Sequence, residues 1–237
     1  MGALDRIRQR FQHASVTDRG VIRRVGQDDE MALRERLAQD PNDVEAFARL
    51  AEVVRARAAE GHETPAGGVY AEHPPVDPDR AADDAVWALA EELAWSGRAW
   101  YPLIEMARLS IEDDREAALR RLGTAAERDP SGRALAAGLQ MLREAGHPAD
   151  ALALGTGHWR PREHELEAGQ QMVEAALEAG RTAEARRHLE AISEHPDRAG
   201  VEALHAKLSR LIETGARPSV IDVRSERPSR LWPFSRR

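Results

Sequence analysis

The segment Glu144-Ala145-Gly146 recurs 34 residues later as Glu178-Ala179-Gly180, and this repeat guides the interpretation of the rest of the chain. Ala151 and Ala185 each stand five residues after the glycine, so they too are 34 residues apart. A helical pattern precedes each glycine, and another begins after it. A fixed spacing of this length is typical of stacked helix–turn–helix units. The sequence therefore predicts an all-α fold built from repeated helix pairs.

Helical periodicity extends over most of the chain on both sides of this repeat. Apolar residues recur at i, i+3, i+4 and i+7, as they do in an amphipathic helix, and prolines or glycines separate the segments. Asp43 and Ser131 are expected to cap the helices that follow them. The predicted helices cover residues 3–12, 28–39, 44–60, 81–96, 99–112, 114–128, 132–145, 148–156, 163–179, 182–194 and 198–214.

These spacings resemble the tetratricopeptide repeat, a helix pair with a glycine in its turn and alanines on its second helix. The resemblance covers about 43–60 and 81–195, and it implies a right-handed α-α solenoid of antiparallel helix pairs that binds proteins. Whether the helix at 114–128 is the first or the second of its pair stays open. The resemblance rests on first-helix patterns at Phe47, Leu50, Ala51, Val54 and at Val86, Leu89, Ala90, Leu93, Gly97, on second-helix residues Ala118, Leu122, Ala125, Pro130, and on Gly146 with Ala151 and Gly180 with Ala185.

Changes in composition divide the chain into four predicted regions. An N-terminal helical segment covers 1–60, a Pro- and Gly-rich stretch 61–80, the repeat body 81–214, and a basic tail 215–237. About 20 residues without regular structure are uncommon inside a compact domain. The stretch 61–80 is therefore either a linker between two helical parts or a long surface insertion. The tail, with its three prolines, is expected to be disordered in isolation.

The amino-acid composition excludes several kinds of chemistry and indicates the cellular compartment. The 237 residues carry a net charge of −7 and include no cysteine, which excludes disulfides, thiolate nucleophiles and cysteine-based zinc sites. No apolar run approaches the roughly 20 residues that span a bilayer, and no apolar leader follows Met1, so we expect a cytoplasmic protein. Lys207 is the only lysine and Asn42 the only asparagine, a bias towards arginine that is typical of high-GC bacterial genomes.

Catalytic motifs are not found in the sequence. With Lys207 as the only lysine, no phosphate-binding G-K-[ST] loop exists, and neither G-x-S-x-G nor H-E-x-x-H occurs. The acidic pairs stand at helix starts or on polar faces, where solvation or the helix dipole explains them. We therefore expect a protein that is not an enzyme, with no catalytic residues, no cofactor and no metal site.

The resemblance also implies a partner-binding inner face, if Val86, Leu135 and Gly169 hold equivalent positions in their units. The family's known clamp for C-terminal carboxylates uses lysine and asparagine, and neither falls on this face. A basic or mixed peptide is therefore the expected partner. The inner-face residues that follow from this alignment are Asp84, Trp87, Glu91, Arg133, Gln140, Arg143, Glu167, Gln170 and Glu174.

The charge of the two ends differs from that of the middle. Residues 1–25 and 215–237 each carry +4, whereas the middle carries −15. The tail could bind a partner or dock on its own solenoid or on a second copy, and a free, solvated tail is the alternative. Its candidate contact residues are Arg230, Leu231, Trp232, Phe234, Arg236 and Arg237.

A second class of function would use the basic ends directly. Residues 3–12 form either a helix packed on the body or a surface helix that touches anionic lipid, so peripheral membrane contact is an alternative reading. The acidic middle argues against nucleic acid. Trp232 lies in a tail without a core to join, whereas Trp87, Trp95 and Trp100 fall near one helical hairpin, where packing is their expected role.

Overall fold

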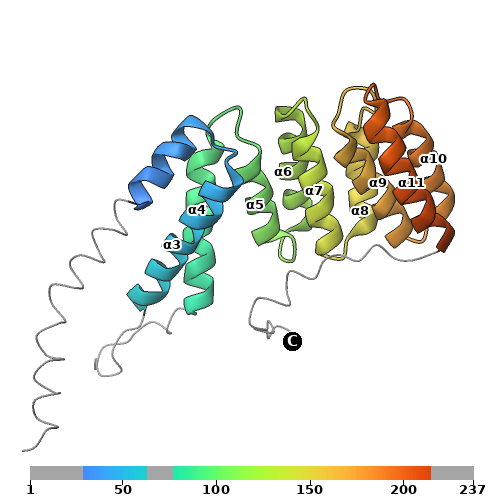
Figure 1. Ribbon diagram of the computed structural model, residues 1–237. Coiled ribbons are helices and arrows are strands. Elements are labelled where there is room, and N and C mark those ends of the chain that lie inside the picture. Colours follow the sequence, from blue (N-terminus) through green and yellow to red (C-terminus); the bar gives the residue numbers. More distant parts are fainter. Residues whose placement is uncertain (1–28, 63–76, 215–237) are drawn as a thin grey trace, which may run out of the picture. The chain divides into compact units, whose positions relative to one another are not determined.

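The computed structural model describes residues 29–62 and 77–214. Within these two ranges every regular element is a helix, ten in all, and no strand occurs (Figure 1). The prediction of an all-α protein is therefore confirmed at the level of fold class. The predicted helix over 3–12 and the tail over 215–237 lie outside the described residues.

The helices follow one another with short connections. An unlabelled helix over 29–39 comes first. The nine that follow are α3 (Val44–His62), α4 (Pro78–Ala94), α5 (Tyr101–Ser110), α6 (Arg115–Arg128), α7 (Arg133–Glu144), α8 (Pro148–His158), α9 (Leu166–Glu178), α10 (Thr182–Ile192) and α11 (Arg198–Thr214).

The chain divides into two compact units, one up to residue 109 and one from residue 110. In the first unit, α3 and α4 pack against each other, although the stretch 63–76 separates them in sequence. The predicted division at 61–80, with one body over 81–214, therefore differs from the division of the fold. Because the two flanking helices share a core that includes Phe47, Leu50 and Leu89, this stretch joins two parts of one unit.

The Asn42 side chain forms hydrogen bonds with the backbone at the start of α5, within the first unit. Its Oδ1 accepts hydrogen bonds from the backbone N–H groups of Trp100 at 2.7 Å and Tyr101 at 3.0 Å. Its Nδ2 donates to the Arg98 carbonyl at 2.9 Å. The first N–H groups of a helix have no partner within the helix, so a side chain 58 residues earlier in the sequence supplies their acceptor.

Trp95 and Trp100 have different surroundings in the same region. Trp100 is buried at 8 % exposure, as expected, and its ring meets that of Tyr101 edge-on at 5.9 Å. Trp95, by contrast, is 87 % exposed. It stands at the C-cap of α4, one residue beyond the helix, and the core lies on the face that carries Val86, Leu89 and Ala90. The prediction that Trp95 packs in the hairpin is wrong.

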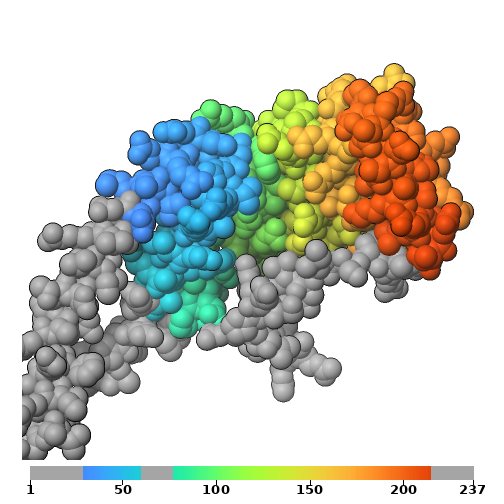
Figure 2. All heavy atoms as spheres, viewed as in Figure 1, coloured from blue at the N-terminus to red at the C-terminus, as the bar shows by residue number. Residues whose placement is uncertain are grey.

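In the second unit, α7, α9 and α11 form a row in which each packs against the next. α6, which precedes α7 in sequence, and α8 and α10, which lie between the helices of the row, pack beside this row (green to red in Figure 1). In the space-filling view the side chains close the gaps between these ribbons (Figure 2). The core is rich in alanine and leucine, which suits closely spaced helices.

The turns at Gly146 and Gly180 have the same geometry, 34 residues apart. Their φ angles are 82° and 74°, in the left-handed region that favours glycine. His147 N–H donates to the Leu142 carbonyl at 2.8 Å, and the equivalent bond from Arg181 to Ala176 measures 2.7 Å. Both turns thus close a helix in the pattern known as the Schellman motif.

The alanines that follow these turns are equivalent as well. Ala151 is the fourth residue of α8, and Ala185 is the fourth residue of α10. Both are fully buried, with 0 % exposure. The prediction that they occupy equivalent buried positions is therefore confirmed.

The predicted cap of α7 requires a correction. Asp43 caps α3 as expected, since its carboxylate accepts the Ala46 N–H at 2.9 Å. At α7 the N-cap residue is Gly132, and it is Asp129 whose carboxylate accepts the Ala134 N–H at 2.7 Å. The same carboxylate accepts the Ser131 hydroxyl at 2.7 Å. The Ser131 hydroxyl oxygen also accepts the N–H of Arg133, the first residue of α7, at 3.4 Å. The buried Asp129 holds the shorter bond and is the main capping side chain.

Helix boundaries agree with the sequence to within a few residues. The largest differences are at the start of α4, which is Pro78 where the sequence predicts 81, and at the start of α9, which is Leu166 where the sequence predicts 163. Before it, the Glu163 N–H donates to the Arg160 carbonyl at 3.1 Å, and the Glu165 N–H donates to the Ser131 carbonyl at 2.8 Å. These bonds hold the chain in a turn against the loop before α7, and this non-local contact delays the helix.

Candidate functional site

The nine predicted inner-face residues belong to two different units, so they are described as two sets. Asp84, Trp87 and Glu91 lie on α4 in the first unit. Both carboxylates are exposed, and the Trp87 ring is half-buried. Trp87 is therefore partly accessible from solvent, and its two acidic neighbours on the helix remain solvated.

The other six residues lie in the second unit, at or near α7 and α9. Arg133, Gln140 and Glu167 are exposed, and Gln170 is half-buried. Arg143 and Glu174 are both buried, at 8 % exposure. The resemblance implied that all six face a groove, and for Arg143 and Glu174 this expectation is corrected by the packing of α7 against α9.

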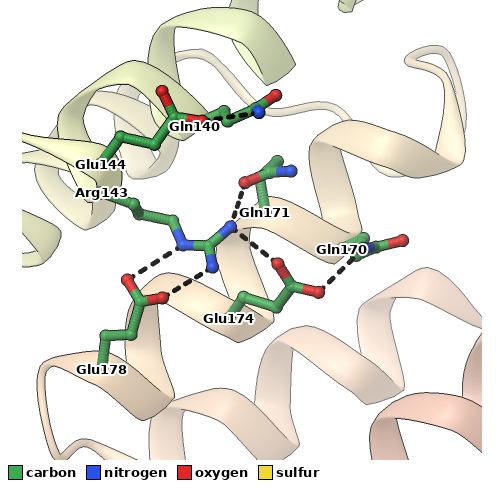
Figure 3. A network of polar contacts seen from close by, with 7 residues as sticks. All are labelled: Gln140, Arg143, Glu144, Gln170, Gln171, Glu174 and Glu178. Atoms are coloured by element: carbon green, nitrogen blue, oxygen red, sulfur yellow. Dashed lines mark hydrogen bonds and ion pairs between the residues drawn. The ribbon is translucent and has the colours of Figure 1, made fainter. Parts of the chain in front are cut away.

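Arg143 is the centre of a polar network between these two helices (Figure 3). Its Nε and one terminal nitrogen donate to the two carboxylate oxygens of Glu178, at 3.0 Å and 2.6 Å. Its other terminal nitrogen donates to Glu174 at 2.7 Å and also to the Gln171 side-chain oxygen. The planar guanidinium can form two parallel hydrogen bonds with one carboxylate. Arg143 of α7 therefore donates hydrogen bonds to three side chains of α9.

The electrostatics keep Arg143 charged. Burial alone would lower its pKa, but the hydrogen bonds that it donates to Glu178 and the attraction of Glu174 and Glu178 outweigh this, so the pKa is raised. The side chains of Arg143, Glu174 and Glu178 are 6 %, 10 % and 12 % exposed. The network is therefore largely shielded from water. Its two carboxylates and one guanidinium together carry one net negative charge.

Gln171 and Glu178 are not among the residues that the sequence predicted for the site. A signal for them exists, because Gln171, Glu174 and Glu178 follow one another at i, i+3 and i+7 on one face of α9. Arg143 precedes Glu178 by 35 residues, about one repeat. A polar stripe on one helix and an arginine one repeat earlier is the pattern that indicates an inter-repeat ion pair.

Two further side-chain pairs extend the network towards the surface. Gln170 donates to the free oxygen of Glu174 at 2.8 Å, and Gln140 donates to Glu144 at 2.8 Å (Figure 3). Arg133 lies 3.6 Å from Glu165. The side chains that remain accessible in this set, such as Glu167, are polar, whereas the ionic centre at Arg143 is buried.

Histidine is the other chemically active residue type in the second unit. His147, His164 and His188 each have a buried ring nitrogen without a hydrogen-bond partner. They stand on separate elements, and no group of three or more potential metal ligands occurs among the residues that the structure describes. The expectation of no metal site and no cofactor stays a prediction for the whole chain.

The candidate tail residues Arg230, Leu231, Trp232, Phe234, Arg236 and Arg237 lie outside the described residues. No helix within 29–62 and 77–214 is long and apolar enough to cross a membrane. Comparison of the chain with protein-family models, with curated proteins and with solved structures found no match.

Proposed function

We propose that the chain is a non-enzymatic adaptor or scaffold of the cytoplasm that binds a protein or peptide partner on a tetratricopeptide-like solenoid. The observation that carries the proposal is the equivalence of α7–α8 and α9–α10 at a period of 34 residues, with matching glycine turns and matching buried alanines. Repeats of this kind place equivalent side chains side by side along one row of helices. Arg133 and Glu167 are such a pair, and both are exposed.

The partner that fits this face is a basic or mixed peptide. Arg143 is neutralised by Glu174 and Glu178, so it offers no free positive charge to an acidic ligand. Glu167 is exposed in the first turn of α9, and Glu165 is exposed at its N-cap. Carboxylates with exposed polar neighbours favour arginine- or lysine-containing segments, mainly through steering and specificity.

A peptide-binding measurement tests this proposal. Labelled peptides of one length, with basic, mixed or acidic C-terminal sequences, are titrated with the full chain and followed by fluorescence polarisation. Basic or mixed peptides should bind more tightly than acidic ones. Glu167→Ala should weaken binding, whereas Glu190→Ala, at a glutamate that is also exposed but lies on α10, is the matched control. Preferential binding of acidic C-termini, or equal losses for both variants, would contradict the proposal.

The alternative function is a peripheral factor that uses its basic ends on a membrane or a nucleic acid. Its support is the +4 charge of residues 1–25 and of residues 215–237. Salt separates the two functions, because phosphate or lipid binding through exposed arginines falls steeply as salt is added. Sedimentation with anionic vesicles at low and high salt, compared with peptide binding under the same conditions, decides between them.

Self-docking of the C-terminal tail remains part of the proposal. An arginine-rich segment with Trp232 and Phe234 complements an acidic helical surface in charge and apolar content. A partner would then displace it. Trp232 fluorescence, in a variant whose other four tryptophans are phenylalanine, is the readout. A blue-shifted maximum that moves to the red with salt supports docking, and a water-like maximum at every salt concentration contradicts it.

A further inference from the structure

The first unit has a hollow of about 360 Å³ where the helix over 29–39 meets α3 and α4. Its lining is mainly apolar, with Val54 and Ala58 from α3 and Ala85, Ala88 and Leu89 from α4. Three of these five residues are alanines, whose methyl groups leave the space between the helices unfilled. Ala88 is exposed, so the hollow is open to solvent along α4.

The rim of the hollow is charged but largely neutralised. Arg34 donates to Glu30 at 3.0 Å and lies 3.9 Å from Glu92, which also lines the hollow. Arg57 pairs with Glu30 at 2.5 Å. Glu30 is buried, and its hydrogen bond from Arg57 lowers its pKa more than burial raises it. The two rim arginines are thus held by carboxylates, and an apolar floor lies between them.

We propose that residues 3–12 of the same chain dock in this hollow as an amphipathic helix. Leu4, Ile7 and Phe11 fall on one face at i, i+3 and i+7, and Arg6, Arg8 and Arg10 surround them. Three apolar side chains match an apolar floor in chemistry. The hollow thereby acts as the internal binding site of the N-terminal segment.

The position of the hollow in the chain favours this occupant. The helix that begins at residue 29 carries Arg34, which lines the hollow. Sixteen residues, 13–28, connect the proposed segment to that helix, and they can span about 50 Å when extended. A tether of this length keeps the segment at a high local concentration around the hollow.

Charge complementarity favours the same occupant. The described part of the first unit, 29–62 and 77–109, contains fifteen acidic and eight basic residues. Residues 1–25 contain six arginines and two aspartates. Arginines on a helix docked by its apolar face stay at the rim, near exposed acids such as Glu91 and Glu92.

Disulfide trapping in the full chain tests the docking, because the natural chain has no cysteine. Ala3→Cys flanks the apolar face and keeps every anchor and every arginine. It is combined with Ala88→Cys in the hollow, or with Ala56→Cys, an exposed alanine of α3 that does not line the hollow. Docking should make the first pair form an intramolecular disulfide on the order of tenfold faster than the control pair.

Two further variants decide what occupies the hollow. Phe11→Asp should reduce trapping by the first pair to the rate of the control pair, since it places a charge on the apolar face. Deletion of 217–237 should leave the rate unchanged. Equal rates for the two pairs overturn the proposal. So do covalent dimers as the main product, which would place a second copy in the hollow, and a rate that rises on removal of the tail, which would make the tail the occupant.

Discussion

Arg143 of α7 and Glu178 of α9 form a bidentate ion pair at 3.0 Å and 2.6 Å, with both side chains almost fully buried. They stand 35 residues apart, so the pair joins two successive helix pairs of the second unit. Glu174 and Gln171 complete the hydrogen bonding of the guanidinium. The network therefore links α7 to α9. Removing one charged partner should cost more stability than removing all of them together.

Arg143→Ala should destabilise the second unit by about 3–5 kcal/mol, because it leaves two buried carboxylates without their cation. The exposed Arg133→Ala is the control and should change stability by about 0.5 kcal/mol or less. Urea unfolding followed by circular dichroism measures both. Replacing Arg143, Glu174 and Glu178 together with apolar residues of similar size should cost less than Arg143→Ala alone. Equal stability of Arg143→Ala and Arg133→Ala would contradict the assignment.

Ala151→Leu and Ala185→Leu should each overpack the contact between the two helices of a pair, at a cost of about 1–3 kcal/mol. Both alanines are fully buried at equivalent positions. Ala183→Leu, two residues earlier than Ala185 on the exposed face of α10, serves as the control. Thermal unfolding of the three variants gives the comparison, and unchanged stability of both core variants would count against the repeat.

Asn42→Ala should destabilise the first unit by about 1–3 kcal/mol, since the N–H groups of Trp100 and Tyr101 lose their acceptor. Asn42→Asp should be milder. It keeps an acceptor at the start of α5, where the helix dipole favours a negative charge, and loses only the bond to the Arg98 carbonyl. Denaturant unfolding of the two variants checks the order. A larger loss for Asn42→Asp than for Asn42→Ala would refute this role.

The second unit should lose stability as the pH falls below about 6.5. Burial, the larger cause, and repulsion by Arg160 lower the pKa of His164, against the attraction of Glu163 and Asp129. Burial likewise lowers the pKa of His188, against the attraction of Glu184 at 3.9 Å. A histidine with a depressed pKa is held neutral in the fold. Its contribution is present above the unfolded pKa of about 6.5 and is lost as the pH falls through the folded pKa.

The pH dependence itself is the readout for these histidines. Unfolding free energies at pH 8 and pH 5.5 should differ less in the double variant His164→Asn, His188→Asn than in the natural chain, whatever the absolute stability of the variant. His205→Asn is the control, because His205 is exposed on α11. An unchanged difference in the double variant would show that other groups control stability in this pH range.

The sequence by itself determined the helices and two of their turns. Apolar periodicity is a local property, so it located α3 to α11 to within a few residues. Gly146 and Gly180 marked turns because only glycine adopts a positive φ without a steric cost. Ala151 and Ala185 could be recognised as buried from the repeat alone, because equivalent positions in stacked units share one environment.

Only the tertiary structure decided which polar residues are available to a partner. The fates of Arg143 and Glu174 depend on how α7 packs against α9, and that register is not encoded in either helix alone. In the same way, the partners of the Asn42 side chain at the start of α5 are as far as 58 residues away in the sequence. Trp95 is exposed because it follows the last residue of α4 and does not share the face of that helix that meets the core. For a charged side chain on a helix surface, the free energy of staying in water and the free energy of being buried in an ion pair are similar. Small differences in the position of a neighbouring helix therefore determine whether it is a binding residue or an internal ion pair.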